Sequence, residues 1–379
     1  MKADPETDPV PLTERQAFLV LNALPEIGPI GLNRLLADLG GDPRRVLESS
    51  GDRLREAGIG PAAVTAILSW REHFDPVAEE GKLTRCGADF IAAGDRGYPS
   101  TLRLIHDPPI GLYRLGPHAF DRPGIAIVGT RRATPYGRAV ARRLAAEFTG
   151  AGFCIVSGLA EGIDTAAHEG ALEAGGPTVA VLGTGPDLVF PSGNRQLQQR
   201  IAATGAVLSE FPFGRRATRQ SFPMRNRIVS GLSEAVIVVE SGVAGGAMIT
   251  AGLAGEQGKP LFAVPGRIDQ PTSAGCHQLL RDGASLLTCA QDVLQELSYL
   301  GGLRPLPIPP RGARRLASGS VEGDEARLLA CLAGGEALTV DGLAGATGWP
   351  AARVSAGLLL LELGRRAARR LDGAYEAIG

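Results

Sequence analysis

The chain has 379 residues, of which 44% are hydrophobic, and a formal net charge of −1. This length allows two or three domains of the usual size, about 100–200 residues each. A nearly neutral chain does not attract nucleic acid as a whole, so any DNA binding has to come from arginines that are grouped locally.

The five cysteines are scattered and form no C-x-x-C pair, which argues against a disulfide framework and against a structural zinc site. The N-terminus has no apolar signal-peptide core, and no apolar run reaches about 20 residues. We therefore expect a reduced, soluble, cytoplasmic protein that holds no metal and no cofactor.

Residues 1–12 are polar and are expected to be disordered, whereas residues 13–88 are expected to form a small helical domain. Two passages, Leu24–Leu36 and Leu54–Val64, place glycines in a tight turn between apolar helix faces, as in SAM-like and helix-hairpin-helix modules. Helix-hairpin-helix turns contact a DNA phosphate through backbone amides. A bundle that only packs stays open as an alternative, because only two arginines lie near these turns.

Residues 89–300 alternate strand-like and helix-like segments, which predicts a Rossmann-like, doubly wound α/β core with a mostly parallel sheet. At its start, short apolar stretches such as Ile110–Tyr113 are expected as edge strands. The strands that follow are predicted at Ile125–Val128, Phe153–Val156, Thr178–Leu182, Ala206–Leu208, Ala235–Val239, Leu261–Val264 and Ser285–Leu287. Helices are predicted at Gly137–Thr149, Asp164–Ala174, Cys276–Arg281 and Ala290–Leu297.

Residues 301–320 are rich in Pro, Arg and Gly and are expected to form a linker. In residues 321–379, three short helices and a terminal hairpin predict a winged-helix domain, the helices lying at Asp324–Leu332, Thr339–Thr347 and Ala351–Leu363. The third helix would be the recognition helix, but it is apolar apart from Arg353. We therefore expect this domain to suit a protein partner better than DNA.

The first candidate site follows the strand Ile125–Val128 and consists of Gly129, Thr130, Arg131 and Arg132. Open α/β sheets bind ligands at the carboxyl ends of their strands, and the helix N-termini found there favour anions such as phosphate. Gly129 allows the close backbone approach that such a turn needs. We expect Arg131 to face the ligand, while Arg132 can equally well be solvated.

A second loop, rich in small residues, follows the next strand and begins with Ser157 and Gly158. Its backbone amides are suited to cradle an anion. Asp164 is expected to cap the helix that starts there. His168 lies on the same helix face but has no third ligand nearby, which favours a structural hydrogen bond over a metal site.

The strongest chemical signal is a turn whose arginines, aromatic ring and amide are Arg219, Phe222, Arg225, Asn226 and Arg227. Guanidinium groups fork onto phosphates, and an aromatic ring offers an unpaired base a stacking surface. Several arginines indicate several phosphates, and hence a polynucleotide. One of Arg225 and Arg227 is expected to be structural, paired with an internal carboxylate such as Glu240.

A further glycine pair, Gly245 and Gly246, lies between a strand and a helix and would let a ligand backbone approach closely. Thr250 is expected to be a helix residue rather than a nucleophile. No Ser-His-Asp or Cys-His arrangement is recognisable in the α/β core of the sequence.

Four ordered motifs resemble the DNA-processing protein A family (DprA, also called Smf): Ile127–Arg131, Ser157–His168, Phe222–Leu232 and Gly246–Ala251. The resemblance covers about residues 95–298 and fits the helical N-terminus and the winged-helix C-terminus. It implies a protein that binds and protects incoming single-stranded DNA and loads the RecA recombinase in natural transformation, working as a homodimer through the Rossmann-like domain.

The same resemblance implies a DNA pocket that uses Arg131, Arg219, Phe222 and Arg225. Arg219 stands where a lysine is common, which keeps the charge but changes the hydrogen-bond geometry. The alternative is a LOG-like phosphoribohydrolase that cleaves nucleoside monophosphates. These enzymes carry a P-G-G-x-G-T-x-x-E motif, and the corresponding stretch from Gly245 to Gly252 lacks both its proline and its catalytic glutamate. This absence argues for binding without chemistry, so we expect a protein that is not an enzyme.

Overall fold

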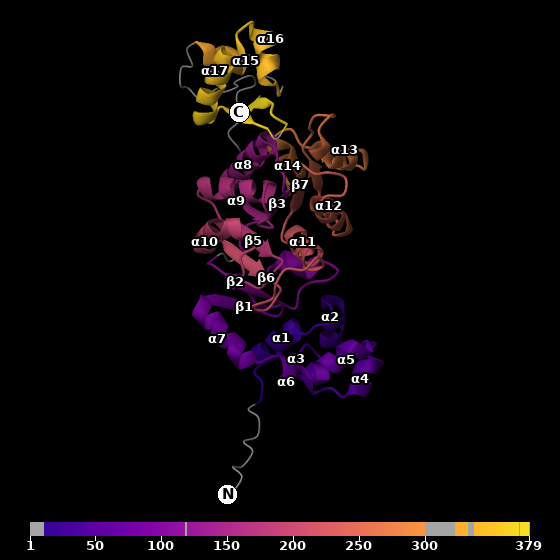
Figure 1. The fold of residues 1–379 in the computed structure, drawn as a ribbon. Coiled ribbons are helices and arrows are strands. Elements are labelled where there is room, and N and C mark those ends of the chain that lie inside the picture. The colour runs from indigo at the N-terminus through magenta and orange to yellow at the C-terminus, as the bar shows by residue number, and fades with distance from the viewer. Residues whose placement is uncertain (1–10, 118–119, 300–322, 333–336, 371, 379) are drawn as a thin grey trace.

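The computed structural model describes residues 11–117, 120–299, 323–332, 337–370 and 372–378. Figure 1 shows an N-terminal group of helices, a central α/β part and a C-terminal group of helices arranged one after another along the molecule. Among the helices in these ranges, none combines the length and the apolar character that a membrane span requires.

The N-terminal helices surround an apolar core to which Leu19, Leu35 and Leu54 contribute. The helices are α1 (Glu14–Ala23), α2 (Pro29–Asp38), α3 (Pro43–Glu48), α4 (Gly51–Glu56), α5 (Pro61–Leu68), α6 (Trp70–His73) and α7 (Pro76–Cys86). The two glycine passages do form turns, and α2 and α5 each begin with a proline at the first helical position, where its missing N–H costs nothing.

A nine-stranded sheet forms the centre, in the order β1-β2-β6-β5-β4-β3-β7-β8-β9. The pairs from β6 to β9 are all parallel, and β2 joins β6 antiparallel. The strands are β1 (Ala88–Ala92), β2 (Gly111–Leu115), β3 (Gly124–Val128), β4 (Cys154–Ser157), β5 (Thr178–Leu182), β6 (Ala206–Ser209), β7 (Ala235–Val238), β8 (Leu261–Ala263) and β9 (Ser285–Leu286). The predicted, mostly parallel α/β fold is confirmed.

Helices cover both faces of the sheet. The strand β3 is therefore buried on both sides, which explains why its sequence is apolar throughout. Ile125 and Ile127 pack in the core below α8, α9 and α14, whereas Ala126 and Val128 pack in the core below α11, α12 and α13. The helices are α8 (Pro135–Gly150), α9 (Ile163–Glu173), α10 (Arg195–Thr204), α11 (Ser221–Gly231), α12 (Gly246–Glu256), α13 (Ala274–Arg281) and α14 (Ala290–Glu296); the short 3-10 turns are η1 (Ser100–Leu104), η2 (Ser192–Asn194) and η3 (Pro271–Ser273). A strand buried on both faces needs no polar alternation.

Two predictions need correction here. The arginine-bearing segment Phe222–Arg227 is not a turn, because it lies within α11. Pro223 falls in the first turn of that helix, where a missing N–H breaks no hydrogen bond. Ile110–Tyr113 does mark a strand, β2, but β1 lies outside it and forms the edge of the sheet.

The C-terminal part contains α15 (Asp324–Cys331), α16 (Val340–Thr347), α17 (Ala351–Leu363) and a hairpin of β10 (Ala367–Arg369) and β11 (Tyr375–Ala377). These are the predicted three helices and hairpin. The hairpin contacts the central part, where the backbone N–H of Tyr136 donates to the Glu376 carboxylate over 3.2 Å. The linker predicted at residues 301–320 lies outside the described residues, and so does the predicted disordered segment 1–12 apart from its last two residues.

Candidate functional site

A cavity of about 140 Å³ opens beyond the carboxyl ends of β3, β4 and β5. It lies beside the point where the strand order reverses between β3 and β7, which is where open α/β sheets bind ligands. Its lining residues are Arg131, Gly158, Ala160, Glu161, Gly183, Thr184, Phe190, Pro191, Phe222 and Arg225. The structure thus brings together four of the residues proposed from the sequence: Arg131, Gly158, Phe222 and Arg225.

One wall of the cavity is a group of flat side chains. The guanidinium carbon of Arg131 lies 5.1 Å from the centre of the Phe222 ring, within the range of a cation–π contact. The Phe190 ring centre lies 5.7 Å from that of Phe222, and Phe190 is 47% exposed. These rings offer stacking surfaces next to a positive charge, which suits an unpaired base joined to a phosphate.

Arg225 lines the cavity and is only 5% exposed. Its Nη1 donates to the backbone oxygen of Val181 over 2.6 Å, but its Nε finds no hydrogen-bond partner among the described residues. Burial lowers the pKa of Arg225 to about 10, so the group is still charged at neutral pH. A buried cation with an unused hydrogen-bond donor lowers the stability of the folded protein. An anion bound in the cavity would reduce this loss of stability.

The loop after β4 is held by Asp164 in a way that the sequence did not indicate. The Asp164 carboxylate accepts the backbone N–H groups of Gly158 over 3.1 Å and Ala160 over 3.4 Å. Asp164 is therefore not the cap of α9, whose N-cap is Gly162. These two amides are already used, so the expected cradle of free loop amides is not present at Gly158 and Ala160.

The pKa of Asp164 is raised by burial, and the nearby charge of Arg225 opposes that rise. The two groups thus stabilise each other's charge inside the fold. Gly158 is essential to this packing, since a Cβ there would overlap with Nη1 of Arg225. Ser157 does not face the cavity: its hydroxyl is fully buried and donates to the Ile127 backbone oxygen over 2.7 Å.

Gly129 and Thr130 build the turn that carries Arg131. The backbone N–H of Thr130 donates to the Glu240 backbone oxygen over 2.7 Å, and its carbonyl accepts from the N–H of Ile163 over 3.3 Å. A side chain at Gly129 would collide with Ile163 and with the Glu240 backbone. These residues therefore fix the direction of Arg131 rather than lining the cavity themselves.

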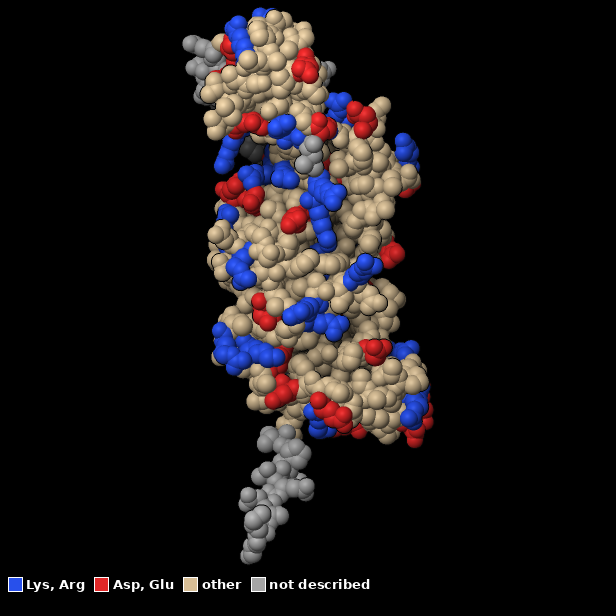
Figure 2. All heavy atoms as spheres, in the orientation of Figure 1, with Lys and Arg blue, Asp and Glu red and all other residues tan. Residues whose placement is uncertain are grey.

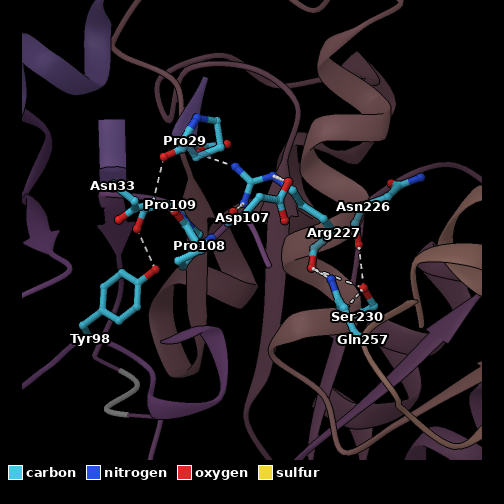
Figure 3. Close-up of polar contacts among 11 residues, drawn as sticks. Pro29, Asn33, Tyr98, Asp107, Pro108, Pro109, Asn226, Arg227, Ser230 and Gln257 are labelled. Carbon is cyan, nitrogen blue, oxygen red and sulfur yellow. Dashed lines mark hydrogen bonds and ion pairs between the residues drawn. The ribbon is translucent and has the colours of Figure 1, made fainter. Parts of the chain in front are cut away.

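Arg227 is the structural arginine of the pair, and Figure 3 shows it beside Asp107. It is 4% exposed and forms ion pairs with Glu210, which is buried, and with Asp107, whose Oδ2 lies 3.3 Å from Nε. The expectation of a structural role is confirmed, but the suggested partner was wrong. Glu240 instead accepts hydrogen bonds from the backbone N–H and the hydroxyl of Thr134, over 2.9 Å and 2.6 Å.

The other proposed residues do not line the cavity. Arg219 is exposed in the loop before α11. Asn226 connects α11 to α12 through a long contact of 3.4 Å from its amide to the Gly246 carbonyl. Gly245 and Gly246 form the start of α12, and Thr250 is buried within that helix, as expected.

Six lining residues were not among those proposed from the sequence: Ala160, Glu161, Gly183, Thr184, Phe190 and Pro191. Gly183 and Thr184 directly follow β5, so their position at a strand end was a usable signal. Phe190 and Pro191 lie outside every regular element expected from the sequence. Only the three-dimensional path of this loop places them next to Phe222.

His168 makes the structural hydrogen bond expected of it, since its Nδ1 lies 2.7 Å from the Thr178 hydroxyl and the ring is fully buried. Within the described ranges, no group of three or more His, Cys, Asp or Glu side chains is arranged to hold a metal ion. Burial, assisted by the charge of Arg225, lowers the pKa of His168 from 6.5 to about 3.

This shift predicts a loss of stability in mild acid. The unfolded chain takes up a proton on this histidine below its ordinary pKa, whereas the folded protein does not. The stabilising contribution is therefore complete above pH 6.5 and is lost as the pH falls toward 3. From about pH 7.5 to about pH 5 we expect a loss of about 2 kcal/mol from this group. Urea unfolding measures the free energy of unfolding at both pH values. Between them, His168→Gln should lose about 2 kcal/mol less than wild type. An equal loss in the two proteins would mean that His168 takes up its proton in the folded state as well.

Comparison with known proteins gives two family matches. Residues 89–298 match the model described as DNA recombination-mediator protein A, and residues 312–373 match the DprA winged helix domain. The chain is 39% identical to a putative DNA processing protein DprA of Mycobacterium tuberculosis, with 86% of both chains covered. It is 37% identical to the Smf protein of Escherichia coli, over 84% of this chain and 83% of that one.

Two solved structures are similar as well. DNA processing protein A from Streptococcus pneumoniae superposes with a TM-score of 0.65 at 33% identity, covering 75% of this chain and 98% of that one. The same protein from Helicobacter pylori, solved for its mode of single-stranded DNA binding, gives a TM-score of 0.51 at 34% identity, covering 56% of this chain and 96% of that one. The sheet, the motifs and these matches agree, and the chain belongs to the DNA processing protein A family, DprA/Smf.

Proposed function

We propose that this chain binds single-stranded DNA in the cavity lined by Arg131, Phe222 and Arg225. The observation that carries the proposal is the buried, incompletely bonded guanidinium of Arg225 beside the Arg131–Phe222 stack. The Helicobacter pylori relative with a described single-stranded DNA binding mode supports it. Duplex DNA hides its base faces, whereas an unpaired base can stack on Phe222 and Phe190.

In this mechanism Arg225 and Arg131 bind phosphate oxygens, and the two phenylalanine rings stack with a base. Arg219, at the end of the loop that leads into α11, contacts the strand outside the cavity. Phosphate contacts and stacking do not read base identity. Binding should therefore vary little with sequence.

The test is a fluorescence titration of a labelled oligo-dT at several salt concentrations, with wild type and Arg131→Ala. Loss of one phosphate contact should weaken binding and lower the salt slope by about 0.7. Arg132→Ala is the matched control, because Arg132 is exposed and does not line the cavity. Identical titrations for Arg131→Ala and wild type would reject the pocket.

We further propose that the bound strand is protected and passed to the RecA recombinase in the cytoplasm, in DNA recombination and natural transformation. A homodimer formed through the Rossmann-like part would present two such pockets to one strand. Family membership supports these roles. Sedimentation of the purified chain tests the dimer, and RecA filament formation on oligo-dT coated with a single-strand binding protein, with and without this chain, tests the loading.

We also propose that the chain is not an enzyme. The alternative of a LOG-like phosphoribohydrolase requires a catalytic glutamate after a glycine-rich turn, and the helix that follows Gly245 and Gly246 carries Thr250, 2% exposed, and no acidic residue until Glu256. Incubation with AMP should release no adenine. Adenine release that depends on protein concentration would favour the enzyme.

A further inference from the structure

The segment from Phe211 to Ser233 contains five arginines and no acidic residue. Arg225 and Arg227 are buried, whereas Arg215, Arg216 and Arg219 are exposed on the loop that precedes α11. On the face drawn in Figure 2, basic side chains form small separate groups mixed with acidic ones rather than one continuous surface. A loop with three exposed arginines and no acidic residue of its own therefore differs from the molecule as a whole.

The backbone of this loop is fixed at successive points. The N–H of Phe213 donates to the buried Glu79 carboxylate over 3.0 Å, and the N–H of Gly214 donates to Asp187 over 2.9 Å. The carbonyl of Arg215 accepts from the N–H of Gly185 over 2.8 Å. An ordered backbone lowers the entropy cost of binding a charged ligand.

The contact between Gly185 and Arg215 also places the loop next to the cavity. Gly183 and Thr184 line the cavity, and Gly185 is the next residue along the chain. Arg215 and Arg216 thus lie just beyond this wall. From there the loop runs back to Phe213, whose ring packs edge-on against Tyr113 with centres 5.6 Å apart, beside the N-terminal helices.

The side chains of Arg215 and Arg216 form no ion pair in the part of the chain that the structure describes. The Asp187 carboxylate beside the loop accepts the backbone N–H of Gly214 instead. Exposed arginines elsewhere often do pair, as Arg142 does with Glu169 and Glu173. Exposed, unpaired guanidinium groups on an ordered backbone, beside a cavity that suits an anion, can bind further phosphates of the same ligand.

We propose that Arg215 and Arg216 form a second phosphate subsite, which holds the single strand where it leaves the cavity toward the N-terminal helices. This inference rests on the proposed function of the cavity. The second subsite implies that the bound strand leaves the cavity in one defined direction, and that the DNA contacts the protein over a longer stretch than the cavity alone.

The experiment compares a short oligo-dT of about six nucleotides with one of about twenty nucleotides, titrated against wild type and Arg215→Gln/Arg216→Gln. The double variant should bind the short oligomer as wild type does. It should bind the long oligomer at least about fivefold more weakly, with a salt slope reduced by about 1.4 for two lost phosphate contacts. Arg122→Gln/Arg138→Gln, exposed positions at the amino end of β3 and on α8, controls for the change in net charge and should leave both oligomers unaffected.

If the double variant shows the wild-type salt slope on the long oligomer, there is no second subsite. If it loses the same affinity for both oligomers, the two arginines belong to the cavity site, and the proposal is also wrong. Failure of the cavity itself is recognised separately. In that case the short oligomer would bind Arg131→Ala and wild type alike, whatever the double variant does.

Discussion

Replacement of Arg227 by methionine should lower the free energy of unfolding by about 3–5 kcal/mol, the cost of leaving a buried charge without its partner. Arg227 neutralises Glu210, which is 8% exposed and whose Oε2 finds no hydrogen-bond partner among the described residues. Without the guanidinium, the Glu210 carboxylate must stay charged in an apolar surrounding or take up a proton.

The variant also loses a connection between α11 and the segment that leads into β2. Arg227 donates to the backbone oxygen of Asp107, and the next two carbonyls, of Pro108 and Pro109, accept from Asn33 over 2.7 Å and from Tyr98 over 2.6 Å. Figure 3 shows these side chains converging on the same segment. The substitution should therefore weaken the packing of both the N-terminal helices and the sheet against this segment.

Urea unfolding followed by circular dichroism measures the effect. Arg219→Met is the matched control, because the same substitution at an exposed position should change stability by no more than about 0.5 kcal/mol. Arg227→Met/Glu210→Leu removes both charges and should recover most of the loss. If the double variant is no more stable than the single one, the unpaired charge is not the cause.

The sheet was predictable because its strands are local features. Segments such as Ile125–Val128 and Ala235–Val238 are apolar and rich in β-branched residues, and their boundaries in the sequence and in the structure agree within about one residue. Residues close behind the strand ends, such as Arg131 after β3 and Gly158 after β4, were predictable for the same reason. A strand end is visible in the sequence, and parallel strands bring their ends together.

The parts of the candidate site that could not be predicted depend on contacts between residues far apart in the sequence, and no local sequence pattern contains such contacts. Arg227 and Glu210 lie on different elements, so the sequence showed that one arginine would be structural but not which carboxylate it would meet. Asp is a residue type that commonly caps helices, yet the carboxylate of Asp164 accepts hydrogen bonds from the loop that precedes the helix. Phe190 reaches the cavity only because the loop after β5 folds over Phe222.

The sharpest test of the cavity adds a single methyl group. Gly158→Ala should weaken oligo-dT binding by at least about tenfold, the equivalent of one charge-assisted hydrogen bond, although it changes no charge and no polar group. The new Cβ would occupy the place of Nη1 of Arg225. The guanidinium would have to leave its bond to the Val181 carbonyl and move into the cavity, where the phosphate would otherwise lie.

Gly193→Ala makes the same chemical change in the turn η2, just after Pro191 of the cavity wall, where a Cβ meets nothing within 4 Å. It should bind oligo-dT as wild type does. Thermal unfolding of both variants separates a displaced side chain from a damaged fold, since Gly158→Ala should stay folded at the temperature of the titration. If folded Gly158→Ala binds with wild-type affinity, the position of Arg225 does not determine binding, and the phosphate must be held by the exposed arginines outside the cavity.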